Sequence, residues 1–117
     1  MNFDRFTIAL LLLRKDAPRL EPDAEAQLQD AHMAFLADLH QAGQLLAAGP
    51  VMGAPDRELR GFSIFRVSPE EALQLHQADP AVRAGRYRVE TYPWMLPADV
   101  VSFGSGRFPR SMADVQR

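Results

Sequence analysis

The 117-residue sequence has no cysteine, almost no net charge and no long hydrophobic run. Without cysteine there is no disulfide, no thiolate metal site and no thiol nucleophile, which fits a reducing compartment. The net charge of -2 gives no electrostatic basis for nucleic-acid binding. The apolar run from Ile8 to Leu13 is much shorter than the roughly 20 residues of a membrane span and lacks a signal-peptide cleavage pattern. We therefore expect a cytoplasmic protein with no membrane or nucleic-acid partner.

The remaining composition is that of an ordinary globular domain, with 47% hydrophobic and 24% charged residues. A chain of this length buries a sizeable core without needing disulfide bonds. Hydrophobic periodicity predicts four strands, over residues 6–13, 44–52, 61–67 and 86–95. It predicts a first helix between Asp23, as N-cap, and Gly43, just after its end. A second helix is predicted from Pro69 to about Asp79.

The start of the second helix carries the sharpest local signal in the chain. Ser68 is suited to cap the helix, Pro69 to occupy its first position and Glu71 to complete a capping box. Pro80 disfavours helical geometry at the residue before it, so the helix is expected to stop there.

The order of elements predicts an α+β fold: a ferredoxin-like βαββαβ unit with a four-stranded antiparallel sheet. Both helices would cover one face of this sheet. The first and third strands are apolar on both faces, whereas a solvated face should show polar alternation. We therefore expect a homodimer packed sheet to sheet. Residues 1–96 would form the domain, and residues 97–117 a C-terminal arm that is docked on the dimer or partly disordered.

His32 lies within the apolar stripe of the first helix, four residues after Leu28 and seven before Leu39. This stripe faces the core, so the imidazole is directed to the interior and needs a polar partner. On spacing alone, a backbone carbonyl or a water could satisfy such a core histidine.

Asp79 is the candidate partner, because it continues the inward stripe of the second helix formed by Ala72, Leu75 and His76. A carboxylate bound to one imidazole nitrogen fixes the tautomer and leaves the other nitrogen free to act as a general base. Local alternatives for Asp79 are a bond to His76 or to nearby backbone amides.

A metal site is not expected. His32 and His40 do not share a helix face as an i,i+4 ligand pair would, and no cysteine is present. His40 lies off the stripe and is expected at a solvated edge. No cofactor is expected either.

Five segments carry a resemblance to a known family: residues 32–36 (HMAFL), 42–50 (AGQLLAAGP), 68–72 (SPEEA), 78–85 (ADPAVRAG) and 89–94 (VETYPW). In this order and spacing they resemble the YciI-like (YCII-related) family over about residues 6–96. The resemblance implies a dimeric α+β barrel of ferredoxin-like subunits and a His–Asp pair in a pocket, which falls on His32 and Asp79. Gln29 and Ala81 depart from the family pattern, which has a basic residue and a bulky aromatic one there in many relatives.

The resemblance implies mostly unassigned enzymatic activities, one of them dehydrochlorination of a hydroxylated ring. Three functions are consistent with these observations. The first is a cofactor-free acid/base enzyme, an isomerase or lyase, in which His32 and Asp79 act on a small cyclic or aromatic ligand. The second is a non-catalytic small-molecule-binding or structural homodimer, and the third a small dimeric-barrel monooxygenase. An enzyme site predicts a pocket beside His32 lined by Leu12, Phe35 and Trp94.

Overall fold

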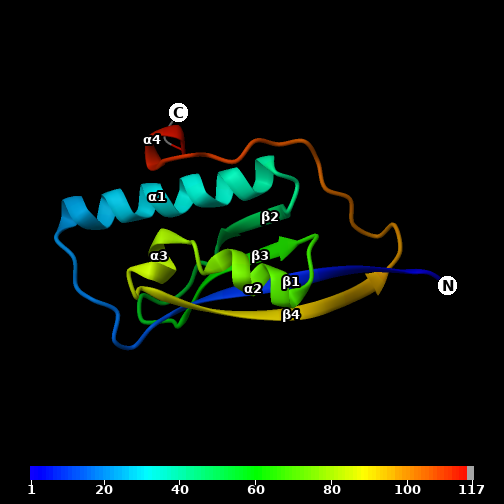
Figure 1. Ribbon diagram of the computed structural model, residues 1–117, viewed down its shortest axis with the longest axis horizontal. Coiled ribbons are helices and arrows are strands. Elements are labelled where there is room, and N and C mark those ends of the chain that lie inside the picture. Colours follow the sequence, from blue (N-terminus) through cyan, green and yellow to red (C-terminus); the bar gives the residue numbers. More distant parts are fainter. Residues whose placement is uncertain (116–117) are drawn as a thin grey trace.

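The strand β1 runs through the middle of a four-stranded antiparallel sheet in the computed structural model, which describes residues 1–115 (Figure 1). The elements in chain order are β1 (Phe3–Leu13), α1 (Pro22–Gln41), β2 (Leu45–Pro50), β3 (Leu59–Phe65), α2 (Pro69–His76), α3 (Pro80–Arg83), β4 (Tyr87–Pro97) and α4 (Met112–Val115). The strand order is β2-β3-β1-β4, with every neighbouring pair antiparallel. This arrangement confirms the predicted ferredoxin-like fold. The short helices α3 and α4 were not predicted.

The first helix begins two residues earlier than predicted. Glu21, and not Asp23, is the N-cap, because Pro22 occupies the first helical position, where its missing N–H costs nothing. The predicted end is confirmed. Gly43 has a φ of 81°, its N–H donates to the His40 carbonyl, and the N–H of Gln44 donates to Leu39. These two bonds form a Schellman motif, which turns the chain directly into β2.

The second helix begins as predicted and ends early. The Ser68 hydroxyl accepts a hydrogen bond from the N–H of Glu71 at 3.2 Å. The helix ends at His76, whereas Asp79 was expected inside it. Asp79 instead caps α3, which restarts with Pro80 at its first position. Proline disfavours helical geometry in the residue before it, so one helix is replaced by two.

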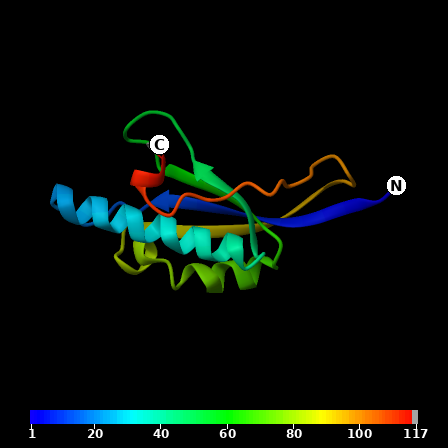
Figure 2. The ribbon, with the colours of Figure 1, turned by 90° about the horizontal axis from the view of Figure 1, so that it is seen from above.

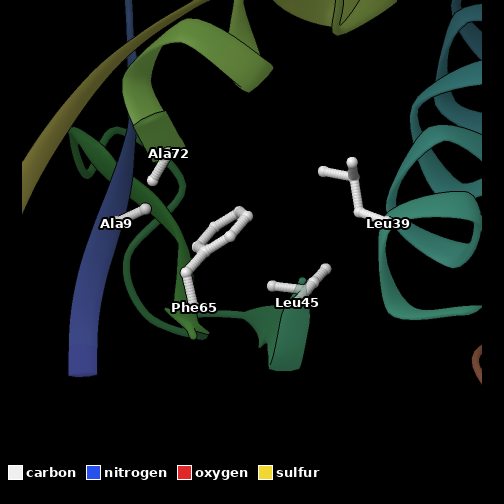
Figure 3. Packing of buried hydrophobic residues seen from close by; sticks show 5 residues of the cluster. All are labelled: Ala9, Leu39, Leu45, Phe65 and Ala72. Atoms are coloured by element: carbon white, nitrogen blue, oxygen red, sulfur yellow. The ribbon is translucent and has the colours of Figure 1, made fainter. Parts of the chain in front are cut away.

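Alternate residues of the sheet face the helix layer. The main core cluster joins Ala9 of β1, Phe65 of β3 and Leu45 of β2 to Leu39 of α1 and Ala72 of α2 (Figure 3). The helices α1, α2 and α3 lie on this side of the sheet in Figure 2. Within residues 1–115, no helix is both long and apolar enough to cross a membrane.

The C-terminal segment from residue 98 onward turns back from the end of β4 and runs along α1 to α4 (Figures 1 and 2). The Arg110 guanidinium lies 2.7 Å from Asp38 of α1, and the N–H of Met112 donates to Asp30 at 2.9 Å. Residues 98–115 of the predicted arm are therefore held against α1 of the same chain, and docking of the arm on a dimer stays a prediction. Residues 116 and 117 lie outside the described residues.

The Gly43 turn gives a first prediction. Replacing Gly43 with Ala places a Cβ at a positive φ and should lower the free energy of unfolding by about 1–2 kcal/mol, measured by urea denaturation. Gly49→Ala is the matched control, since neither position has an atom within 4 Å of the added Cβ and only Gly43 has a positive φ. Equal effects of the two substitutions would contradict the strain argument.

Candidate active site

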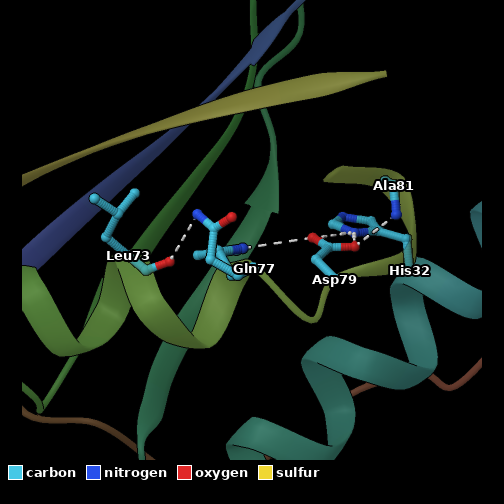
Figure 4. A network of polar contacts seen from close by, with 6 residues as sticks. His32, Leu73, Gln77, Asp79 and Ala81 are labelled. Carbon is cyan, nitrogen blue, oxygen red and sulfur yellow. Dashed lines mark hydrogen bonds and ion pairs between the residues drawn. The ribbon is translucent and has the colours of Figure 1, made fainter. Parts of the chain in front are cut away.

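Two segments far apart in the sequence meet beneath the sheet at His32 and Asp79 (Figure 4). Nδ1 of His32 lies 2.9 Å from both carboxylate oxygens of Asp79. The N–H of Ala81, at the start of α3, donates to Asp79 Oδ1 at 2.9 Å. Asp79 is fully buried and His32 is 7% exposed. The two candidate residues are therefore in direct contact in the interior.

Asp79 remains ionised despite its burial. Burial raises the pKa of Asp79, but the hydrogen bond from His32, the nearby His76 and the N–H of Ala81 outweigh it and lower the pKa to about 2. An ionised carboxylate only accepts hydrogen bonds, so His32 Nδ1 carries the hydrogen between the two residues. In the neutral ring, Nε2 then holds a lone pair and is the proton acceptor.

His76 is a second histidine beside the same carboxylate. Its Nδ1 lies 3.4 Å from Asp79 Oδ2, and its ring packs between those of Phe35 and Phe65. The side chain is fully buried, and among residues 1–115 neither ring nitrogen has a hydrogen-bond partner. The alternatives considered for Asp79 therefore occur together with the His32 contact: it lies beside His76 and caps a backbone amide.

A cavity of about 340 Å³ opens next to His32, between α1, the helix side of the sheet and the C-terminal arm. The wall from α1 consists of Gln29, His32, Met33 and Leu36, which share one helix face at spacings of three and four. No residue among 1–115 hydrogen-bonds His32 Nε2, and this atom is not among the fully enclosed ones. The free imidazole nitrogen is therefore available to a molecule in the cavity.

The three residues predicted to line the pocket do not line it. Leu12 and Trp94 lie on the opposite face of the sheet, where they pair with Arg88 and Phe6. Side chains alternate along a strand, so Leu11 faces the cavity in place of Leu12. Phe35 is turned toward α2 and packs against the core cluster and His76.

Several cavity residues were missed by the sequence analysis. Ser63 of β3 is 2% exposed and lines the cavity. Ser63 is a polar residue at a position of an apolar strand that faces the core, and this pattern would have identified it as a candidate site residue. The arm contributes Phe108, Pro109, Met112 and Val115. His40 was expected at a solvated edge, but its ring stacks on that of Phe108 at 4.1 Å between centroids.

In the described part of the chain, the titratable side chains around the cavity do not form a metal cluster. Within residues 1–115, no group of three or more His, Asp or Glu side chains is placed to hold a metal ion. His32 and His76 share one carboxylate, and His32 Nδ1 is already occupied by it. The arrangement is that of an oriented imidazole base, and the chemistry it supports is proton transfer.

The lowered pKa of Asp79 gives a second prediction. The carboxylate stabilises the fold fully above pH 4, and this contribution is lost as the pH falls toward 2. The difference between 3.8 and about 2 corresponds to about 2 kcal/mol. Asp79→Asn should therefore remove this part of the pH dependence of the unfolding free energy, measured by urea denaturation between pH 5 and pH 2.

The control is Asp16→Asn, which breaks an exposed pair with Arg14 and should leave the acid limb of the stability profile nearly unchanged. An unchanged acid limb in Asp79→Asn would contradict the assignment of an ionised buried carboxylate.

The solved structures that are similar to this chain include the following two. One is 5-chloro-2-hydroxyhydroquinone dehydrochlorinase from Burkholderia phenoliruptrix AC1100 in complex with 2,5-dihydroxybenzoquinone; it is 20% identical with a TM-score of 0.57, over 76% of this chain and 92% of that chain. The other is a dimeric protein of unknown function and ferredoxin-like fold from Bacteroides fragilis NCTC 9343, 14% identical with a TM-score of 0.45, over 79% of this chain and 95% of that chain. At 20% identity the first likeness shows a shared fold.

No functionally curated protein matches the chain. The profile of the YCII-related domain matches residues 8–95. This range extends from β1 into β4 and includes both His32 and Asp79. It leaves the arm outside the match. The chain therefore belongs to the YCII-related domain family.

Proposed function

We propose that the protein is an acid/base enzyme, an isomerase or lyase, that acts on a small hydroxylated ring. The observation that carries this proposal is the difference between the two ring nitrogens of His32. Nδ1 contacts the buried Asp79 carboxylate, and Nε2 is free beside a cavity. A general base needs a free lone pair and an orienting partner, and this ring has both. Proton transfer by an imidazole requires no cofactor.

His32 Nε2 would take a proton from a hydroxyl group of the ring and return it to a ring carbon. This transfer alone is an isomerisation. If the carbon that receives the proton bears a chlorine, it becomes tetrahedral, and loss of a second hydroxyl proton to His32 expels chloride with the bonding electron pair. The net change is loss of HCl, with no oxidant or reductant. Asp79 stabilises the imidazolium that forms at each step.

The cavity favours a planar, mainly apolar ligand with a few polar groups. Leu11, Met33 and Leu36 supply apolar surface, and Ser63 Oγ supplies a second hydrogen-bonding group besides His32. A ring with two hydroxyl groups would satisfy both. The substrate of the Burkholderia enzyme, a chlorinated and hydroxylated ring, belongs to this class. The volume lies within the range of small-molecule sites.

The proposal predicts chloride release from 5-chloro-2-hydroxyhydroquinone, or solvent deuterium exchange into 1,2,4-trihydroxybenzene, under anaerobic conditions. His32→Gln should lower the rate by about 100-fold or more, because a general base contributes that much. Ion chromatography and proton NMR are the measurements.

Circular dichroism and the unfolding midpoint check that His32→Gln remains folded. Wild-type rates no higher than buffer with both compounds, or an unchanged rate in His32→Gln, would favour the non-catalytic binding protein or structural dimer instead. Turnover that occurs in air with consumption of oxygen and stops under anaerobic conditions would favour the monooxygenase.

We further propose that two copies pack through the face of the sheet opposite the helices. The apolar or aromatic side chains on this face include Phe6, Ile8, Leu10, Leu12, Phe62, Ile64, Tyr92 and Trp94. Phe62 is 38% exposed and Tyr92 45% exposed. A contiguous apolar surface of this kind is typical of an interface, because covering it releases about 25 cal/mol per Å².

The assembly proposal predicts that Ile8→Lys, at the centre of this face, yields monomers in sedimentation experiments, whereas wild type sediments as a dimer. Leu73→Lys is the control, since Leu73 is an exposed leucine on α2 in the helix layer. A wild-type monomer, or a dimer unaffected by Ile8→Lys, would contradict this packing.

A further inference from the structure

The C-terminal arm supplies a wall of the cavity although it lies outside the family match. The YCII-related match ends at residue 95, and the arm begins at residue 98. Phe108, Pro109, Met112 and Val115 nevertheless line the same cavity as His32. The residues expected to perform the chemistry therefore lie within the range that matches the family, whereas part of the cavity wall comes from a segment outside that range.

The arm is fixed to the helix that carries the base. The Phe108 ring stacks on His40 with an interplanar angle of 14°. Further along, Arg110 pairs with Asp38, and the N–H of Met112 donates to Asp30. These three partners on α1, His40, Asp38 and Asp30, lie within eight residues of His32 in the sequence. The distance between the arm wall and the imidazole is thus set by contacts to one rigid helix.

We infer that the arm determines which substrates the site accepts, because it sets the size of the cavity. This inference rests on the proposed function for the class of ligand. A benzene molecule fills a cavity of about 150 Å³. The cavity of about 340 Å³ is about twice that volume, so a substituted single ring fits loosely and a two-ring ligand would fill the space up to the arm. Phe108 and Met112 contribute an aromatic face and an adaptable thioether to the ring.

The walls of the cavity that are formed by the sheet cannot move outward to enlarge the cavity. Leu11 and Ser63 belong to the central strands β1 and β3, which hydrogen-bond to neighbours on both sides. Gly61 on the cavity floor is close to Leu11, since an added Cβ would lie 3.3 Å from Leu11 Cβ. At Phe108 and Arg110, the arm is held by side-chain contacts alone, in contrast to the hydrogen-bonded strands. The residues of the arm are therefore the ones that set the size of the cavity.

The test compares binding of two probes, 4-chlorophenol and 4-phenylphenol, to the full chain by isothermal titration calorimetry. Phe108→Ala should shift the ratio of the two Kd values by about 10-fold in favour of 4-phenylphenol, because the lost ring makes room for the second ring of the ligand. Phe103→Ala is the matched control: Phe103 is in the same arm, but its ring packs on Phe6 and does not line the cavity. It should leave the ratio unchanged.

The outcomes separate the arm from the proposed chemistry. A ratio in Phe108→Ala equal to that of wild type, an equal shift in Phe103→Ala, or no binding of either phenol to wild type would overturn the inference. A shifted ratio in Phe108→Ala together with unchanged catalytic rates in His32→Gln would support the arm as a wall and overturn the acid/base proposal. Arg110→Ala, which removes an anchor outside the cavity wall, should shift the ratio in the same direction by less.

Discussion

The burial of one carboxylate is the constraint on which the site depends. A charge without access to water is stable only when hydrogen-bond donors surround it. Asp79 obtains them from His32 on α1 and the backbone of Ala81, with His76 of α2 nearby. These contacts join segments 47 positions apart in the chain and orient the imidazole. The same carboxylate thus links the two parts of the helix layer and defines which nitrogen of His32 is free.

Much of this architecture could be predicted from the sequence. The order of strands and helices follows from periodicity, the Gly43 turn and the Ser68 cap from local chemistry. The placement of His32 follows from its position in an apolar stripe. Each of these features depends on residues that are close together in the chain, so the local sequence pattern is sufficient to predict it. The break between α2 and α3 was missed because Asp79 is both in phase with the stripe and a good N-cap before Pro80.

The pocket walls could not be predicted in the same way. β1 is apolar on both faces, so its sequence does not say whether Leu11 or Leu12 faces the helices. Phe35 and Leu36 are both within the apolar stripe, and only the packing of α2 decides which of them turns toward the cavity. The arm is placed by contacts between residues more than 65 positions apart, such as His40 with Phe108 and Arg110 with Asp38. No local pattern encodes such contacts.

The central claim is that His32 presents an unprotonated Nε2 to the cavity because Asp79 holds the hydrogen on Nδ1. Nitrogen-15 NMR of protein labelled in its histidine rings tests this most directly, with the His32 signals assigned from the His32→Gln variant. We predict the Nδ1–H tautomer for the neutral ring and a change in the Nε2 shift when 4-chlorophenol is added. An Nε2–H tautomer, or an Nε2 shift insensitive to the phenol, would contradict the account.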